Sequence, residues 1–295
     1  MTDARAAALG QQLDRLIADR LAAARAELDV PRSQTDPAAA AAVDIIIPVY
    51  NAPEQVAACL ASVCRHTDAR HRIVVIDDAS TDPRIGPLLE GFQAGRPGLD
   101  VRRNPVNLGY LATVNQALRA SDRDVVLLNS DTQVGPQWLD RLAAAAFSAD
   151  QVGIACPVTD QSGPLGVIDP DRLATLGMDQ ASDLVARSAT AGYPLLPVAV
   201  GFCMYLRRPM LDRVGCFDPA FAPGYGEEND LSMRAWRAGF AIVACPDALV
   251  HHAGSASFGG GAAIERRRAL NGHLLRSRWP NHDALVRTWW ADWPL

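Results

Sequence analysis

The sequence contains no lysine: all 28 residues in its lysine-plus-arginine count are arginine. Arginine is well suited to binding phosphate groups, but an alanine- and arginine-rich composition is also what a GC-rich genome produces, and we give that explanation more weight. With 33 acidic residues the formal net charge is −5, so the chain has no overall basic field that would attract nucleic acid. We therefore expect no nucleic-acid partner.

Metal-binding cysteine pairs and membrane segments are also missing. None of the six cysteines forms a CxxC pair, which argues against a zinc site and a disulfide framework and favours buried, reduced thiols. The opening residues MTDARAAALG have no apolar signal core, and no stretch approaches the roughly 20 apolar residues of a membrane span. We expect a cytoplasmic protein; a peripheral contact with the inner face of the membrane stays open.

Three common motifs of nucleotide and ester chemistry are absent. No GxGxxG follows the first predicted strand, no GxxxxGK[ST] occurs, and no GxSxG is present. Their absence argues against a dinucleotide-binding domain, a P-loop enzyme and an α/β-hydrolase.

What the sequence does contain is an alternation of predicted strands and helices. Its 295 residues are 49% apolar, enough to bury a sizeable core. Strands are expected at 43–50, 71–77 and 123–131, with helices at 51–67, 106–121 and 135–147 and Asn51 as the candidate N-cap of the first. After about residue 150, strands are expected at 196–208 and 241–250 and helices at 209–215 and 230–240. This order predicts an α/β protein with a mostly parallel sheet.

Polar side chains follow three of these strands where each strand ends. Tyr50–Asn51, Asp77–Asp78 and Asn129-Ser130-Asp131 hold these positions. One carboxylate at a strand end most often belongs to a turn, but ligands bind at the carboxyl ends of such strands. Carboxylates, amides and hydroxyls at three neighbouring ends therefore favour hydrogen bonds to a nucleoside and a divalent cation that bridges to phosphate.

Seven segments together resemble family 2 glycosyltransferases with the GT-A fold. DIIIPVYNAPEQVAACLASV, IVVIDDASTD, NPVNLGYLATVNQAL and VVLLNSDT resemble the nucleotide-sugar half, and GFCMYLRRPMLDRVGCFDPAF, GYGEENDLSMRAWRAGF and DALVHHAGSASFG resemble the second half. The resemblance covers roughly residues 43–260. It implies a Rossmann-like layered α/β fold with a nucleotide-sugar half at 43–147 and an acceptor and catalytic-base half at 148–262. Outside it lie an expected N-terminal helical arm at 1–35, which could pack on the body or form a homodimer contact, and an arginine- and tryptophan-rich tail at 263–295.

The resemblance also implies a donor site and a metal. The donor-binding residues it indicates are Pro48, Val49, Tyr50, Asn51, Asp77, Asp78, Asn107, Gly109, Asn115, Asn129 and Ser130. Asn129-Ser130-Asp131 falls on the family's DxD motif, with Asn in place of the first Asp. Asp131 keeps the direct ligand of Mn²⁺ or Mg²⁺, and His252, preferred over His251, aligns with a histidine beside the metal and the diphosphate.

Glu227 and Glu228 align with the family's acidic pair at the start of the acceptor-side helix. The second position is the general base, which is Glu228 here, with Glu227 as an acceptor ligand and the alternative base. Acids at a helix N-terminus also gain about 0.3–1 kcal/mol from the helix dipole, so the segment alone does not establish catalysis. A neighbouring like charge would raise the pKa of Glu228.

The expected reaction is an inverting transfer of a sugar from a nucleoside-diphosphate sugar to a hydroxyl of a saccharide or lipid-linked saccharide, in surface polysaccharide synthesis. The alternatives are a non-catalytic sugar-nucleotide-binding protein and a nucleotidyltransferase. Trp279, Trp289, Trp290 and Trp293 of the tail could lie at a lipid interface, but we favour packing against the body as a closing flap.

Overall fold

The computed structural model describes residues 42–161, 163, 165–254 and 262–291. The helical arm predicted at 1–35 lies outside the described residues. The described chain forms one large hydrophobic core around the sheet and a small second cluster under the helices that follow residue 169.

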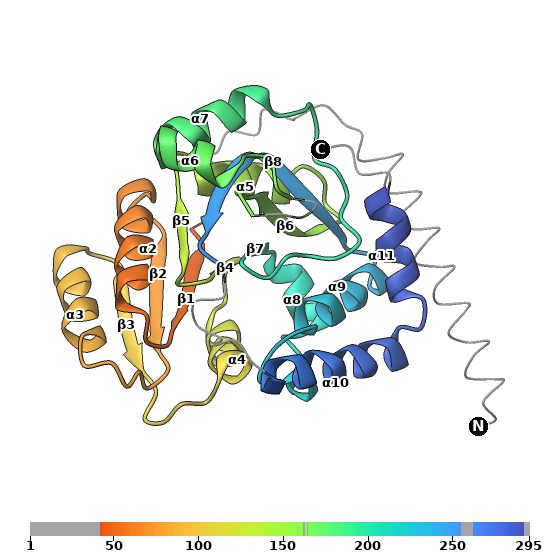
Figure 1. The fold of residues 1–295 in the computed structure, drawn as a ribbon, viewed down its shortest axis with the longest axis horizontal. Helices are drawn as coiled ribbons and strands as arrows, with labels where there is room; N and C mark the ends of the chain where they lie inside the picture. Colours follow the sequence, from red (N-terminus) through yellow and green to blue (C-terminus); the bar gives the residue numbers. More distant parts are fainter. Residues whose placement is uncertain (1–41, 162, 164, 255–261, 292–295) are drawn as a thin grey trace.

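The described residues build one sheet of eight strands, in the spatial order β3-β2-β1-β4-β7-β6-β8-β5 (Figure 1). The strands are β1 (Asp44–Val49), β2 (Arg72–Asp77), β3 (Leu99–Arg103), β4 (Val125–Leu128), β5 (Thr132–Val134), β6 (Val152–Val158), β7 (Cys203–Leu206) and β8 (Ala241–His252). The pairings make β7 and β5 run opposite to the other strands. The predicted α/β fold with a mostly parallel sheet is therefore confirmed.

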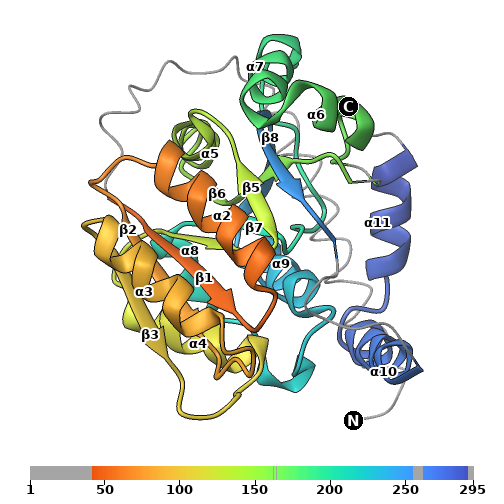
Figure 2. The same cartoon turned by 60° about the vertical axis from the view of Figure 1, so that its left-hand side comes forward.

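Helices follow most strands and cover the sheet. They are α2 (Pro53–His66), α3 (Ile85–Gly95), α4 (Tyr110–Ala120), α5 (Trp138–Ala146), α6 (Pro170–Leu176), α7 (Met178–Ser188), α8 (Arg208–Val214), α9 (Glu227–Arg237), α10 (Ala262–Arg278) and α11 (His282–Ala291). Strands β4, β6 and β7 are buried along their whole length, because both faces of these strands are covered. In Figures 1 and 2, α10 and α11 lie beside α9, on the side of the molecule away from β3.

Several elements differ from the sequence prediction. Helix α3 and strands β3, β5 and β6 were not predicted; β3 has the polar sequence LDVRR at the sheet edge, so it lacks the apolar run of a central strand. The strand expected at 196–208 is reduced to β7. The prediction that Asn51 caps α2 is wrong: the N-cap position is Ala52, which has no capping side chain.

The C-terminal tail forms α10 and α11, which pack against the body. Trp279 is buried and its indole nitrogen donates to Asp230 Oδ1 at 3.1 Å. Trp289 is partly buried and donates to the carbonyl of Leu195 at 2.9 Å. These contacts agree with the closing-flap alternative, while Trp293 lies outside the described residues. Within the described ranges, no helix combines the length and apolarity needed to cross a membrane.

Candidate active site

A cavity of about 430 Å³ lies where the parallel strands β1, β2 and β4 reach their carboxyl ends. Its walls come from the strand ends, the loop before α4, the loop before α9 and the end of β8. The lining residues are Pro48, Val49, Tyr50, Asp78, Asn107, Gly109, Tyr110, Thr113, Asn129, Ser130, Asp131, Pro223, Tyr225 and His252. The fold thus brings together most of the residues that the sequence indicated for the donor and the metal.

Asp78 is fixed at the floor of this cavity by three groups. Its Oδ1 accepts hydrogen bonds from the side-chain amide of Asn104 at 2.7 Å and from the backbone N–H of Leu108 at 2.9 Å. Its Oδ2 accepts from the N–H of Gly109 at 2.8 Å. One carboxylate therefore positions the loop before α4, which carries the predicted donor residues Asn107 and Gly109.

Three of the predicted donor residues lie outside the lining and hold the scaffold. Asp77 is buried and accepts from Arg103 at 2.6 Å and from the N–H of Ser80 at 2.8 Å. Asn51 accepts from the N–H groups of Thr81 and Asp82, at 2.8 and 2.9 Å, and so connects the ends of β1 and β2.

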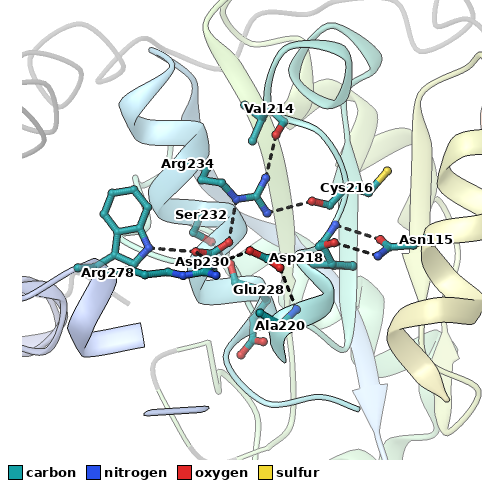
Figure 3. Close-up of polar contacts among 12 residues, drawn as sticks. Asn115, Val214, Cys216, Asp218, Ala220, Glu228, Asp230, Ser232, Arg234 and Arg278 are labelled. Atoms are coloured by element: carbon teal, nitrogen blue, oxygen red, sulfur yellow. Dashed lines mark hydrogen bonds and ion pairs between the residues drawn. The ribbon is translucent and has the colours of Figure 1, made fainter. Parts of the chain in front are cut away.

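Asn115, the third, is buried in α4 and bonds both backbone groups of Phe217 (Figure 3). The distances are 2.9 Å to the carbonyl and 3.0 Å from the N–H. This reciprocal pair connects the donor half of the chain to the segment that precedes α9.

Near the cavity, several residues other than glycine have left-handed backbone conformations. Asn51, Ala52 and Ala79 follow β1 and β2 with φ of 57°, 55° and 55°, and Tyr225 precedes α9 with φ of 76°. This conformation costs alanine and larger residues roughly 1–2 kcal/mol. Its concentration at the strand ends is typical of a site whose geometry is maintained by the surrounding fold.

Asp131 and His252 are brought side by side by the pairing of β5 with β8. Thr132 is opposite His252 in the ladder, and the N–H of Ala253 donates to the carbonyl of Asp131 at 2.9 Å. His252 Nε2 lies 3.4 Å from Asp131 Oδ1, and its ring stacks on Phe202 with centroids 5.3 Å apart. The chain thus presents one carboxylate and one imidazole to the cavity from two strands.

Asp160 contacts both histidines at the end of β8. It is buried, and its Oδ2 lies 2.8 Å from His251 Nδ1 while its Oδ1 accepts from the N–H of His252 at 3.2 Å. Burial opposes ionisation of Asp160, but the contacts with the two histidines outweigh it and hold its pKa below the ordinary value. The ring of His251 therefore contacts Asp160, whereas His252 lines the cavity. Sequence reasoning missed Asp160, because nothing near it in the chain marks it.

The donor set of Asp131 and His252 fits a divalent cation that shares its shell with phosphate. Such ions bind through one or two protein groups and keep substrate phosphate oxygens as further ligands. The described residues contain no group of three or more His, Cys, Asp or Glu side chains arranged for a metal. We therefore expect Asp131 and His252 to bind the cation only together with a diphosphate. This agrees with Asn129 in the DxD-like segment, which brings no second charge.

Glu227 and Glu228 open α9 after the Tyr225–Gly226 turn. Glu227 is 8% exposed, and its Oε2 is buried without a hydrogen-bond partner among the described residues. Burial, followed by the charge of Glu228, raises the pKa of Glu227. Burial also raises the pKa of Glu228, although backbone hydrogen bonds oppose it. The pair is therefore poorly solvated and retains capacity to take up a proton.

Tyr110 connects the two groups of acids across the cavity. It lines the cavity, and its pKa is raised well above its ordinary value, first by burial and then by the charges of Glu227, Glu228 and Asp131. All three carboxylates thus lie within electrostatic range of one hydroxyl. Pro223 and Tyr225, from the segment that leads into α9, line the same cavity as Asp131. Sequence reasoning did not single out Tyr110 or Tyr225, although both stand inside the motifs that it quoted.

The buried Asp230 attaches helix α9 to neighbouring segments. This carboxylate accepts from Arg234 Nε at 2.8 Å, from Trp279 Nε1 at 3.1 Å and from Arg278 Nη1 at 3.3 Å. Arg234 also donates to the carbonyls of Val214 and Cys216, both at 2.9 Å (Figure 3). Asp230 makes no capping hydrogen bond in α9; it connects α9 to the C-terminal helices and, through Arg234, to the segment before it.

With this geometry in place, comparison with known proteins gives a consistent result. The sequence profile described as "Glycosyl transferase family 2" matches residues 44–215, more than half of the chain. The O-antigen biosynthesis protein RfbC of Myxococcus xanthus is 24% identical over 234 residues, which are 71% of this chain and 17% of that protein. The chain therefore spans only a small part of this relative's length.

Two solved structures share the fold at low sequence identity. Crystalline GalNAc-T7 with UDP, GalNAc and Mn²⁺ superposes with a TM-score of 0.62 at 15% identity, covering 83% of this chain and 51% of that one. The mannosyltransferase PcManGT from Pyrobaculum calidifontis, in complex with GDP-Man and Mn²⁺, gives a TM-score of 0.57 at 18% identity and covers 98% and 88%. These similarities show a GT-A-like fold, and the two proteins carry different nucleotides.

Proposed function

This chain belongs to glycosyl transferase family 2, and from that premise we propose that it transfers a sugar from a nucleoside-diphosphate sugar to an acceptor hydroxyl with inversion at the anomeric carbon. One observation carries the proposal: the cavity that Asp131 lines is also lined by Tyr225, which lies two residues before the Glu227–Glu228 pair. A diphosphate in this cavity would therefore lie close to a carboxylate pair that can accept a proton.

On the donor side, Pro48, Val49 and Tyr50 bound the nucleobase and Asp78 shapes the nucleoside pocket through the loop before α4. Asp131 and His252 hold a divalent cation, Mn²⁺ or Mg²⁺, together with the diphosphate. When bound, this cation supplies charge neutralisation for the leaving group. Asn129 contributes hydrogen bonding without charge, so the cation depends strongly on Asp131. Two solved relatives of the same fold contain Mn²⁺, which supports this choice.

On the acceptor side, Glu228 takes the proton of the hydroxyl that attacks the anomeric carbon, and the diphosphate leaves from the opposite face. A general base is most effective when its pKa lies near the working pH, and burial shifts the pKa of Glu228 in that direction. Glu227 lies beside it, with one buried oxygen that has no hydrogen-bond partner among the described residues. Glu227 remains the alternative base.

For the biological role we propose the assembly of a surface saccharide, by analogy with the relative described as an O-antigen biosynthesis protein. The acceptor is then a saccharide or a lipid-linked saccharide, reached in the cytoplasm at the inner membrane face. The family match and the cavity favour glycosyl transfer over nucleotidyl transfer. A homodimer contact through the N-terminal arm stays a prediction on residues outside the described ranges.

The test is an assay of donor hydrolysis and transfer with a panel of UDP- and GDP-sugars, with Mn²⁺, with Mg²⁺ and with chelator. We expect one donor to be turned over with Mn²⁺ or Mg²⁺ and the rate to fall to background with chelator. Calorimetry on the same panel measures binding separately. Binding without any turnover, on a range of saccharide acceptors, would instead identify a non-catalytic sugar-nucleotide-binding protein.

A further inference from the structure

A chain of hydrogen bonds leads from the candidate base to the C-terminal helices. Asn229 Nδ2 donates to Glu228 Oε1 at 2.9 Å. On the other side of that amide, Asn229 Oδ1 lies 3.2 Å from Nε2 of His282, the first residue of α11. The other ring nitrogen of His282, Nδ1, lies 2.9 Å from Asp283 Oδ1. Four consecutive polar groups therefore connect Glu228 to a segment more than fifty positions later in the sequence.

The location of His282 argues for a specific role. Its ring is buried, at 6% exposure, although a histidine beside a loop between two helices could easily face water. A buried imidazole must have partners for its nitrogens, and both of its nitrogens lie at hydrogen-bonding distance within this chain. The helix pair is already attached elsewhere, because Asn271 donates to the carbonyls of Phe221 and Gly224 at 2.8 and 2.7 Å. In α11 itself, Trp289 donates to the carbonyl of Leu195 at 2.9 Å, so this helix has an attachment besides the contact with Asn229.

The chemistry of the amide gives the chain a direction. When Glu228 is ionised it can only accept, so Asn229 presents its NH₂ group to Glu228 and its oxygen to His282. That oxygen needs a donor, and His282 Nε2–H supplies it. If the amide rotated, its oxygen would face the Glu228 carboxylate and the two acceptors would repel. A donor at Nε2 of His282 thus fixes the amide in the orientation that stabilises ionised Glu228.

We propose that Asn229, His282 and Asp283 form a positioning chain that holds the ionised Glu228 carboxylate in the orientation needed to take the acceptor proton. This inference rests on the proposed function, because it assumes that Glu228 is the base. The three residues touch no substrate and act through Glu228. The C-terminal helix α11 is thereby part of the acceptor site, although it lies outside the segment that the family profile matches.

Other charged groups surround both ends of the chain. Glu227 of α9 lies in electrostatic range of Glu228. Tyr110 of α4 lies in electrostatic range of both glutamates. Near Asp283, Arg276 of α10 lies 3.7 Å from Oδ2, and Arg287 of α11 acts at longer range. The His282 contact and these arginines hold the pKa of Asp283 below its usual value, so Asp283 accepts from Nδ1–H of His282 as a carboxylate. Because Nε2–H donates to Asn229 at the same time, the ring of His282 is an imidazolium in this chain.

Two neutral variants at one position separate positioning from packing. In His282→Gln the terminal amide nitrogen reaches the place of Nε2 and can still donate to Asn229. In His282→Asn the shorter amide reaches only the place of Nδ1, so the donor to Asn229 is lost while a polar group stays near Asp283. We expect kcat of His282→Asn to fall on the order of tenfold to a hundredfold, the value of a hydrogen bond to a charged group. His282→Gln should keep most of the activity, and the donor KM should change in neither variant.

The pH profile adds a readout that packing alone would not move. Losing the donated hydrogen bond makes the ionised form of Glu228 less favourable, so the acidic limb of kcat should move to higher pH in His282→Asn and stay in place in His282→Gln. His273→Asn, at an exposed position of α10, is the matched control and should leave rate and profile unchanged. Equal rates and equal profiles in the two His282 variants would overturn the positioning chain.

A measurement without substrate keeps this proposal separate from the proposed function. We would record the imidazole ¹⁵N resonances of His282, assigned by their loss in His282→Asn, in the wild type and in Glu228→Gln. The chain predicts that Glu228→Gln shifts the Nε2 resonance and that this response disappears in an Asn229→Ala background. A response that persists without Asn229 would be a direct field effect and would contradict the chain. If the wild type transfers no sugar, the proposed function fails, and this spectrum still decides whether the four groups are connected.

Discussion

The acids of the donor side and the acids of the acceptor side differ in how completely they are hydrogen-bonded. Asp78 accepts three hydrogen bonds and Asp77 accepts from an arginine and a backbone N–H. Glu227, by contrast, buries an oxygen that has no partner among the described residues, and burial raises the pKa of both Glu227 and Glu228. Asp77 and Asp78 therefore set the shape of the donor pocket, whereas burial of Glu227 and Glu228 favours uptake of a proton.

The largest effect is expected from neutralising the candidate base. Glu228→Gln keeps the size of the side chain but removes its capacity to accept a proton, so kcat should fall about 10²- to 10⁴-fold. Donor affinity should be unchanged, because Glu228 is not among the residues that line the strand-end cavity. Steady-state kinetics and calorimetry measure the two quantities. Glu90→Gln, at an exposed position of α3, is the control, and a Glu228→Gln enzyme with wild-type turnover would assign the base elsewhere.

The second effect concerns the buried hydrogen bonds of Asp230, which attach α9 to neighbouring segments. Asp230 is 1% exposed and accepts hydrogen bonds from Arg234, Arg278 and Trp279. Asp230→Ala leaves these donors without their common partner and should lower the free energy of unfolding by about 3 kcal/mol, measured by denaturant titration.

Asp212 offers a matched control for this experiment. It pairs with Arg208 at the same i,i+4 spacing, but its side chain is 66% exposed. Asp212→Ala should therefore change stability by less than about 1 kcal/mol. Similar losses in the two variants would show that burial of the Asp230 network contributes nothing beyond an ordinary surface pair.

The third effect tests the metal-binding side. Asp131→Asn removes the charged member of the Asp131–His252 pair and should weaken binding of a nucleoside diphosphate in the presence of Mn²⁺ by about 10- to 100-fold. Binding measured with chelator should be the same in variant and wild type. Asp140→Asn is the control, because Asp140 of α5 takes part in a partly exposed ion pair with Arg70. An equal loss with and without Mn²⁺ would mean that Asp131 acts through the fold.

The smallest effect is a gain in stability from removing a poorly solvated charge. The folded-state pKa of Glu227 is raised above its ordinary value of 4.5, so its stabilising contribution is fully present below the unfolded pKa and is lost as pH rises through the folded pKa. Glu227→Gln should therefore gain stability relative to wild type as pH increases, by about 1 kcal/mol between pH 4 and pH 9. Denaturant titrations at several pH values test this. A difference that is independent of pH would contradict the raised pKa.

The sequence predicted β1, β2 and β4 because their apolar runs are continuous, and it predicted the strand-end residues because parallel strands end at one edge; it missed the equally buried β6. It did not predict β3, whose LDVRR sequence is polar, nor β5, whose three residues pair only with the distant β8. Within the site, Asp131 and His252 were expected from motifs. Asn115, predicted at the donor site, connects α4 to Phe217, a contact that only the tertiary fold reveals.

The groups that orient the functional side chains were equally hidden. Asp160 contacts His251, 91 positions away, on the metal side, and His282 contacts Asn229, 53 positions away, beside the base; no local pattern marks either residue. Motifs thus indicate which groups perform chemistry, while the groups that orient them depend on long-range packing.

The most direct test of the shared cavity is a crystal structure of the protein with Mn²⁺ and the nucleoside diphosphate that binds best. We expect the cation on Asp131 and His252, the nucleoside beside Tyr50 and Asp78, and the Glu228 carboxylate facing the diphosphate across a space that one sugar fills. A nucleotide bound elsewhere, or Glu228 directed away from the diphosphate, would contradict this account.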